Sequence, residues 1–209
     1  MIGFLHAGAA SRDATVDELA RQRTQQKAVH LVEPSLVDPS AREFVIDDER
    51  YRTFRACAQQ LVALRSDRLI LTCSAYNGVA KWLADDLAVP VERSDAAGAR
   101  ALLRTRGPVG VLVSFAPTLP VVIDYLSEVF ANAEQEREIR AVIADAPPFS
   151  STPEAYRSEL VAALPSLRGC GVLFVTQYSM HLHLPAIRAA WGAGEIVSAV
   201  SATVASLAA

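Results

Sequence analysis

Short apolar runs alternate with longer amphipathic segments along the chain, a rhythm typical of strands alternating with helices. The runs that we interpret as strands cover residues 2–6, 28–32, 68–72, 89–91, 109–113, 140–144 and 171–176. Apolar residues at helical spacing predict helices over residues 15–26, 47–65, 77–87, 96–104, 152–164 and from 118 to beyond 130. Thr15 followed by Glu18 has the spacing of a capping box, so we expect the first helix to begin there.

Strands that alternate with helices pair into parallel sheets with helices on both faces. We therefore predict an α/β fold of two similar lobes, each with a roughly four-stranded, mainly parallel sheet flanked by helices. The first lobe is expected to comprise residues 1–95 and 182–209, and the second lobe residues 96–181. The apolar C-terminal run, residues 193–209, carries Ser and Thr throughout, and we expect a packed helix there.

The composition limits the classes of function. Of the 209 residues 51% are hydrophobic, which is enough for a sizeable core, and the formal net charge is −3. No basic stripe is present to bind phosphates, so we expect no nucleic-acid partner. No apolar stretch is long enough to span a membrane, and the N-terminus lacks the pattern of a signal peptide, so we expect a cytoplasmic protein without a membrane partner.

The chain has three cysteines, Cys57, Cys73 and Cys170, an odd and sparse set that argues for reduced thiols and against a structural zinc site. Cys57 lies on the apolar stripe of a predicted helix and is expected to pack in the core. Cys170 precedes a predicted strand whose far end lies roughly 20 Å away, so it is a poor candidate for a catalytic thiol at the strand ends.

Ligands of parallel α/β sheets bind beyond the carboxyl ends of the strands. This rule selects residues 6–8, 33–35, 72–76, 114–118 and 176–180. Cys73 follows a predicted strand and precedes a helix, where free backbone N–H groups suit an anion and lower the pKa of a thiol. We interpret Cys73 either as a catalytic base or nucleophile or as a buried, inert cysteine, and its position alone does not decide between them.

Other polar residues in these segments have alternative interpretations. The hydroxyl groups of Ser114 and Thr118 either bind a carboxylate or satisfy the local backbone, and His6 ends the first strand, where it could face the pocket. His181 and His183 are two residues apart, which places them on different faces of the helix expected there, so we predict no metal site. No glycine-rich phosphate loop occurs in the sequence, so we expect no nucleotide cofactor.

Several segments, taken in order, resemble the aspartate/glutamate/hydantoin racemase superfamily, whose relatives include arylmalonate decarboxylase and maleate isomerase. They extend over most of the chain and read IGFLHAG, KAVHLVEPSLV, LILTCSAY, VPVERSDAAGARALL, GVLVSFAPTL and GVLFVTQYSM. The resemblance implies two similar lobes with the active site between them and catalysis without a cofactor. In typical members two cysteines lie on opposite faces of the substrate's α-carbon, where one removes a proton and the other returns one.

Matched residue by residue, Cys73 occupies the first-thiol position and Gln177 the second. Glutamine cannot usefully accept or donate a proton at neutral pH, so ordinary two-thiol racemisation is not expected. Arylmalonate decarboxylase also works with one thiol, but at the other position. Tyr76 stands near a position where many members carry a small residue, so we expect a reshaped pocket. The substrate-binding residues that we predict are His6, Ser74, Ala75, Tyr76, Ser114, Pro117, Thr118, Gln177 and Ser179.

These observations together predict a cofactor-independent, racemase-like isomerase or lyase that acts at the carbon next to a carboxylate, with Cys73 as the general acid/base or nucleophile. One-base racemisation, with a water or His6 opposite Cys73, is a second hypothesis. Decarboxylation of a malonate-like acid, and a binding or regulatory member of the family without turnover, are the remaining alternatives. The expected partner is a small carboxylate substrate; a homodimer is left open, and no metal or other cofactor is expected.

Overall fold

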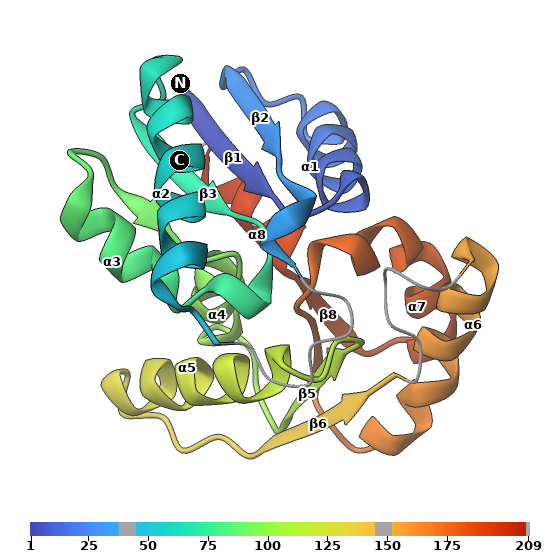
Figure 1. Ribbon diagram of the computed structural model, residues 1–209. Helices are drawn as coiled ribbons and strands as arrows, with labels where there is room; N and C mark the ends of the chain where they lie inside the picture. Colours follow the sequence, from blue (N-terminus) through green and yellow to red (C-terminus); the bar gives the residue numbers. More distant parts are fainter. Residues whose placement is uncertain (38–44, 145–151, 208–209) are drawn as a thin grey trace.

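The computed structural model describes residues 1–37, 45–144 and 152–207, which form two α/β lobes, each built on a four-stranded sheet (Figure 1). The first sheet has the order β2-β1-β3-β4 and the second the order β6-β5-β7-β8, and all neighbouring strands are parallel. The strands of the first sheet are β1 (Ile2–His6), β2 (Ala28–Val32), β3 (Arg68–Leu71) and β4 (Val91–Glu92). Those of the second sheet are β5 (Val109–Val113), β6 (Ile139–Ile143), β7 (Val172–Val175) and β8 (Glu195–Ser198). The predicted fold class is thereby confirmed.

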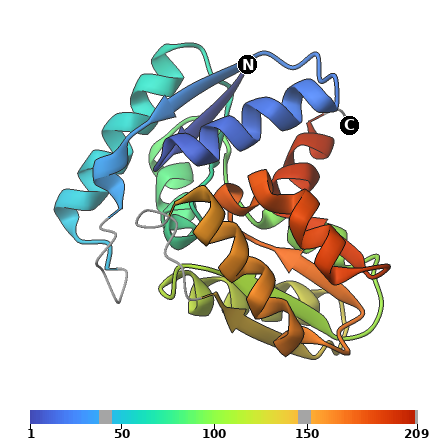
Figure 2. The same cartoon turned by 90° about the vertical axis from the view of Figure 1, so that its right-hand side faces the viewer.

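Helices cover the faces of both sheets (Figures 1 and 2). The α-helices are α1 (Ala9–Arg21), α2 (Asp48–Ala63), α3 (Val79–Asp86), α4 (Ala96–Leu102), α5 (Thr118–Asn132), α6 (Pro153–Ala163), α7 (Leu184–Trp191) and α8 (Ala199–Ser206). Short 3-10 helices follow several strands and helices, and they are η1 (Pro34–Leu36), η2 (Ser74–Tyr76), η3 (Leu164–Leu167) and η4 (Tyr178–His183).

The central strands are mostly apolar because helices cover both of their faces. Every residue of β1 and of β5 is buried, whereas the edge strands β2 and β6 are partly exposed. Successive residues of β7 therefore enter different cores: Leu173 packs with the α6 and α7 side of the second lobe, and Phe174 packs with the α4, α5 and α8 side. These rigid central strands carry the segments that build the site described below.

The C-terminal segment differs from the sequence prediction. β8 pairs with β7 at the edge of the second sheet, so this strand does not belong to the first lobe, where the division at residue 182 placed it. α8 follows β8 and packs on both α4 and α1. The strand was missed because residues 193–209 form one run of small and apolar residues, whose pattern does not separate a short strand from a helix.

The first helix also begins earlier than predicted. Gly8 is the N-cap of α1, and Thr15 lies inside the helix, where its hydroxyl donates a hydrogen bond of 2.8 Å to the carbonyl of Ser11. The spacing of Thr15 and Glu18 therefore does not mark a capping box, and Glu18 has other partners, which are described below. The misplacement arose because Gly8-Ala9-Ala10 carries no capping side chain that would mark a helix start.

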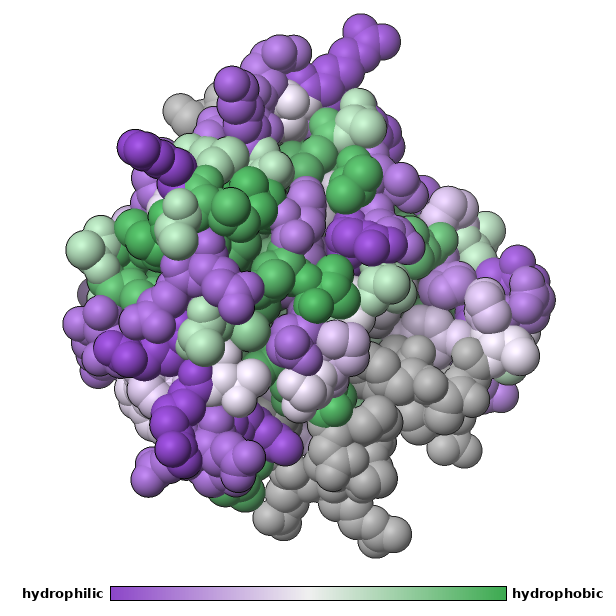
Figure 3. All heavy atoms as spheres, turned by 45° about the horizontal axis from the view of Figure 1, so that its top comes forward, coloured by the Kyte–Doolittle hydropathy of each residue, from purple (hydrophilic) through white to green (hydrophobic). Residues whose placement is uncertain are grey.

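On the face shown in Figure 3, hydrophobic side chains lie interspersed with hydrophilic ones. The most exposed large apolar side chains among the described residues include Val45, Leu64 and Trp82. Within the described ranges, no helix combines the length and the apolar character that crossing a membrane requires.

Candidate active site

A pocket of about 230 Å³ lies between the two lobes, at the carboxyl ends of the strands. Its lining comes from the segments that follow β1, β3, β5 and β7, namely residues 7–11, 72–74, 115 and 177–179. Four of the five segments that the strand-end rule selected from the sequence therefore meet in one place, and residues 33–35 are not among the lining. The pocket thus joins residues that are far apart in the chain.

Cys73 lines this pocket and is half-buried, at the point where β3 ends and η2 begins. Burial raises the pKa of the Cys73 thiol to about 12, although the backbone N–H groups of Ala75 and Tyr76 act in the opposite direction. The sequence predicted a lowered pKa, and this differs because η2 is a single short turn whose two N–H groups do not outweigh desolvation. The Cys73 side chain is therefore a protonated thiol at neutral pH.

The other two cysteines lie away from the pocket. Cys57 is buried in the core of the first lobe, as predicted from its helical stripe. Cys170 precedes β7, at the end of the strand opposite to Gln177, and packs against the core of the second lobe. Cys73 is thus the one cysteine of the three that lines the pocket.

Gln177 lines the pocket from the second lobe, and its carboxamide has a fixed orientation. Its Oε1 accepts hydrogen bonds from the backbone N–H of Ser114 at 2.6 Å and from the Ser114 hydroxyl at 3.2 Å. A backbone N–H can only donate, so the atom facing Ser114 is the oxygen, and the other terminal atom of the carboxamide is the nitrogen. Among the described residues, Nε2 of Gln177 has no hydrogen-bond partner, so its two N–H donors are available to a ligand.

Tyr156 completes the support of Gln177, and the sequence analysis missed it. Because the Ser114 hydroxyl donates to Gln177, it accepts from the Tyr156 hydroxyl at 2.8 Å, and Tyr156 in turn lies 3.3 Å from the hydroxyl of Ser179. Tyr156 is buried on α6, within the helix predicted over residues 152–164. No local pattern distinguishes a core tyrosine from one whose hydroxyl supports a pocket wall.

Ser74 and Thr118 bring the two lobes together beside Cys73. Ser74 lines the pocket, and its hydroxyl donates to the hydroxyl of Thr118 at 3.4 Å. Thr118 is the first residue of α5, and Pro117 is the N-cap of that helix. Thr118 and Ser114 are buried behind the lining, so they reach the pocket through Ser74 and Gln177 respectively.

Three further predicted substrate-binding residues lie outside the pocket lining. Ala75 and Tyr76 are buried in the core of the first lobe, where the Tyr76 ring packs edge-on against Phe54 at a centroid distance of 4.6 Å. Pro117 is buried at the start of α5. The pocket wall after β3 is therefore formed by residues 72–74, while the next two side chains anchor this wall to the core.

His6 is buried behind Thr72 and does not line the pocket. The Thr72 hydroxyl donates to the carbonyl of Leu5 at 3.1 Å, so the Nδ1–H of His6 donates to Thr72 at 2.9 Å. Nε2 of His6 then accepts from Nδ1–H of His30, also at 2.9 Å. Burial, followed by the nearby His30 and Arg12, lowers the pKa of His6 to about 3, so its ring is neutral.

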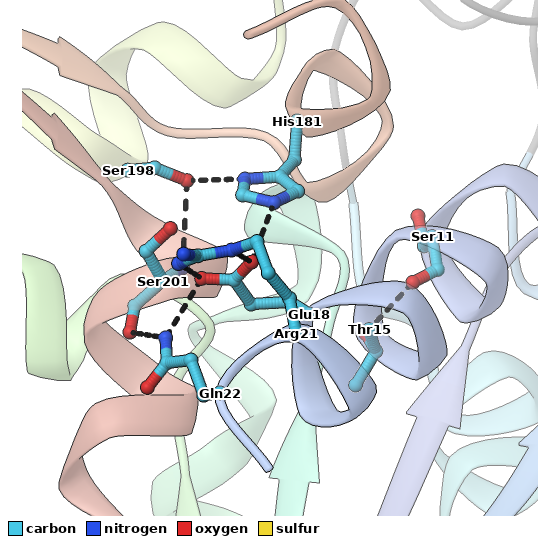
Figure 4. Close-up of polar contacts among 8 residues, drawn as sticks. All are labelled: Ser11, Thr15, Glu18, Arg21, Gln22, His181, Ser198 and Ser201. Carbon is cyan, nitrogen blue, oxygen red and sulfur yellow. Dashed lines mark hydrogen bonds and ion pairs between the residues drawn. The ribbon is translucent and has the colours of Figure 1, made fainter.

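A polar cluster holds α1 against the second lobe, as Figure 4 shows. Glu18 is buried, and its carboxylate accepts two hydrogen bonds of 2.6 Å from Arg21 and one of 2.7 Å from Gln22. Nε2 of His181, in η4, lies 3.4 Å from the same carboxylate, and Nδ1 of His181 lies 2.8 Å from the Ser198 hydroxyl. Since α1 and η4 both begin at the pocket, this cluster joins the elements that carry two of its walls.

No group of three or more His, Cys, Asp or Glu side chains among the described residues could hold a metal ion. His181 is occupied by the cluster of Figure 4, and the ring of His183 packs edge-on against Tyr156 at a centroid distance of 5.3 Å. Both histidines thus have structural partners.

The two sheets of identical strand order, with a pocket between their carboxyl ends, form a two-lobe fold that solved structures of racemases share. A glutamate racemase isoform from Bacillus anthracis shares it with a TM-score of 0.77 and 16% sequence identity, over 99% of this chain and 79% of that chain. An aspartate racemase from Picrophilus torridus has a TM-score of 0.72 and 14% identity, over 99% and 91% of the two chains. An allantoin racemase from Pseudomonas fluorescens has a TM-score of 0.66 and 18% identity, over 99% and 88%.

The two-lobe fold that the family resemblance implied is therefore confirmed. At these identities the likeness is one of fold alone. No protein-family model matches the chain, and no curated protein matches it in sequence.

Proposed function

We propose that the protein is a cofactor-independent isomerase of the racemase type that acts at the carbon next to a carboxylate, with Cys73 as its single acid/base thiol. The observation that supports this best is the position of Cys73 in the pocket between the lobes, with Gln177 on the wall from the other lobe. The racemase fold of the chain is consistent with this assignment. The proposed substrate is a small carboxylic acid.

In the proposed reaction the Cys73 side chain exchanges a proton with the substrate carbon on one face. Because Cys73 is protonated at neutral pH, the thiolate is its minor form. This minor form takes the α-proton and leaves an enediolate, and the resulting thiol returns a proton to the same carbon. Ser74, held by Thr118, and the N–H donors of Gln177 would hold oxygen atoms of the substrate and stabilise the developing negative charge. Gln177 cannot transfer a proton to carbon, so isomerisation requires water as the proton carrier on the opposite face, and without it the reaction is exchange with retention.

Decarboxylation of a malonate-like acid is a second candidate, and the state of the thiol favours it. Burial raises the pKa of Cys73 to about 12, which keeps the side chain protonated and suits a proton donor better than a base. Loss of CO2 from a bound dicarboxylate would leave an enediolate, and Cys73 would protonate it on the carbon. This reaction requires only one proton transfer and therefore only one thiol.

Incubation of carboxylic acids with the protein in D2O tests the proposal. A set containing mono- and dicarboxylates is followed by proton NMR for loss of the α-proton signal, with parallel detection of released CO2. Isomerisation predicts deuterium incorporation without CO2, and decarboxylation predicts CO2 with one deuterium in the product. Exchange with inversion, on both enantiomers of a chiral acid, would identify one-base racemisation with water as the second proton carrier, since His6 does not line the pocket.

If no acid of the set exchanges, loses CO2 or protects Cys73 from alkylation, the proposal of an active enzyme is contradicted. Protection of Cys73 without exchange or CO2 release would instead support a binding or regulatory protein of this fold. Protection of Cys73 therefore distinguishes a protein that binds acids without turnover from one whose pocket binds no acid of the set.

A further inference from the structure

The first turn of α1 presents unpaired backbone donors to the pocket. The N-cap of this 13-residue helix is Gly8, which has no side chain to cap the helix, and no acidic residue follows in the first turn. Among the described residues, the N–H groups of Ala9 and Ala10 have no hydrogen-bond partner, and both residues line the pocket. The start of a helix carries a partial positive charge, so this corner favours a negatively charged group.

Gln177 supplies a second and independent sign of a ligand in the same pocket. Its side chain is only 8% exposed, and Ser114 occupies its oxygen. Nε2 therefore offers two N–H donors to the pocket, and no described residue accepts them. Because Ser114 holds the carboxamide in this orientation, the two donors are placed for an oxygen atom of a ligand, most favourably a charged one.

The absence of ionised side chains from the described lining restricts which charged groups the ligand can carry besides its carboxylate. None of the described lining residues is ionised at neutral pH: they are small or aromatic apolar residues, hydroxyl residues, Cys73 and Gln177. Arg12, in the first turn of α1, is paired with Asp13 and is not part of the lining. An ammonium group would find no carboxylate in this lining and would face N–H donors, which it cannot use.

We infer that the first N–H groups of α1 and Nε2 of Gln177 together form a carboxylate-binding subsite, and that the pocket accepts carboxylic acids without an ammonium group on the neighbouring carbon. The inference rests on the proposed function in one respect, namely that this pocket is the place where the substrate binds. The space of about 230 Å³, lined by Ala7 and Phe115, fits a small apolar group as the remaining part of the acid. Amino acids such as those named for the glutamate and aspartate racemases of this fold are thereby disfavoured.

Titration of 15N-labelled protein by NMR tests this inference without the need for turnover. Two matched pairs of ligands differ only in the ammonium group: propionate against alanine, and phenylacetate against phenylglycine. We expect the two simple carboxylates to shift the backbone amide signals of Ala9 and Ala10 and the side-chain NH2 signals of Gln177, and to bind at least about tenfold more tightly than the amino acids.

The variant Gln177→Glu removes the two donors and adds a negative charge, so phenylacetate affinity is expected to fall about tenfold or more. Gln177→Met, which removes the donors without adding charge, should weaken binding less. Gln25→Glu changes the net charge by the same amount in an exposed loop beyond the other end of α1, and it should bind phenylacetate as the wild type does. A thermal melt of each variant establishes that it is folded.

The inference is overturned if alanine binds as tightly as propionate, if the shifts avoid Ala9, Ala10 and Gln177, or if folded Gln177→Glu retains its affinity. Carboxylates that bind at these amides, while no acid exchanges or loses CO2, would support the subsite and contradict the proposed function. Turnover that depends on Cys73 but not on Gln177, with no shift at α1, would support the proposed function and contradict the subsite.

Discussion

The backbone N–H of Ser114 and Oε1 of Gln177 lie 2.6 Å apart, and this hydrogen bond joins the ends of two neighbouring strands of the second sheet, β5 and β7. It fixes the carboxamide so that its acceptor faces the protein and its donors face the pocket. The position that the family resemblance assigns to a second thiol therefore presents a hydrogen-bond donor that cannot transfer a proton. This relationship separates the pocket from one built for two-thiol racemisation.

Replacement of Gln177 by cysteine tests this difference. If a chiral acid exchanges its α-proton with retention in the wild type, Gln177→Cys should begin to racemise it, because a second thiol would then face the opposite side of the carbon. The substitution leaves the Ser114 N–H without its acceptor, so we expect it to lower the free energy of unfolding by about 1–3 kcal/mol. Chiral chromatography of the recovered acid measures the first effect, and urea unfolding measures the second.

Gln177→Ser is the matched control, because it has nearly the same size as cysteine but no usable proton at neutral pH. It should lose the same support at Ser114 and gain no racemisation. Equal racemisation by the cysteine and serine variants would show that the residue at 177 does not carry the second proton.

The raised pKa of Cys73 predicts slow alkylation at neutral pH. The thiolate is the reactive form, so a folded-state pKa of about 12 means that the rate of reaction with iodoacetamide should rise continuously from pH 7 to pH 10 without reaching a plateau. Peptide mass spectrometry resolves the modification of Cys73 from that of Cys57 and Cys170. A rate that levels off before pH 10, as it does for an ordinary thiol with a pKa of about 8.5, would contradict the assigned environment.

Neutral, buried His6 predicts a loss of stability in acid. Its folded-state pKa of about 3 lies below the ordinary value of 6.5, so the unfolded chain binds the extra proton first. The contribution of His6 is complete above about pH 6.5, and it decreases as the pH falls below that value, by up to about 1.4 kcal/mol per pH unit. Urea unfolding between pH 4 and pH 8 measures this slope.

His6→Phe retains an aromatic ring in the stack with Phe4 and His30 but cannot titrate or bond to Thr72. Its unfolding free energy should depend less steeply on pH than that of the wild type, and the difference between the two proteins should shrink toward low pH. Parallel curves for both proteins would show that another group controls the acid sensitivity.

The lowered pKa of Glu18 predicts a second dependence of stability on pH, in a more acidic range than that of His6. Hydrogen bonds from Arg21 and Gln22, opposing its burial, hold the pKa of Glu18 at about 2, below the ordinary value of 4.5. Its contribution to stability is therefore complete above about pH 4.5 and is lost as the pH falls toward 2. Glu18→Ala should lower the free energy of unfolding at pH 7 by about 2 kcal/mol, because several hydrogen bonds to a charged group disappear.

Glu159→Ala is a suitable control for this measurement, since Glu159 is exposed on α6. The control should stay within about 0.5 kcal/mol of the wild type. Loss of Glu18 should also widen the pocket, because the cluster shown in Figure 4 joins α1 to η4, and faster alkylation of Cys73 would report this. An unchanged alkylation rate would show that the cluster stabilises the fold without positioning the pocket.

Much of the fold could be predicted from the sequence because the buried parallel strands, such as residues 109–113, are unbroken apolar runs. The rule that ligands bind beyond the carboxyl ends of parallel strands also predicts the segments that contain Cys73, Ser74 and Gln177. β8 could not be separated from α8, since a strand of four residues ahead of a helix of small residues leaves no distinct period.

The properties of the pocket residues depend on three-dimensional contacts that the sequence alone does not reveal. Whether burial or the local N–H groups decide the pKa of Cys73 depends on how the lobes close over it. The orientation of Gln177 depends on Ser114, which lies 63 positions away in the chain. Tyr156 donates a hydrogen bond to Ser114, but no sequence pattern around it indicates this role.

The central claim, that Cys73 is the single group that transfers a proton to the substrate carbon, is tested most directly by deuterium incorporation. For an acid that the wild type exchanges or decarboxylates in D2O, the rate constant of deuterium incorporation is measured for the wild type, Cys73→Ala and Cys57→Ala. The claim predicts that Cys73→Ala loses incorporation by at least about a hundredfold, while Cys57→Ala, once shown to be folded, retains it. Incorporation by folded Cys73→Ala at the wild-type rate would contradict it.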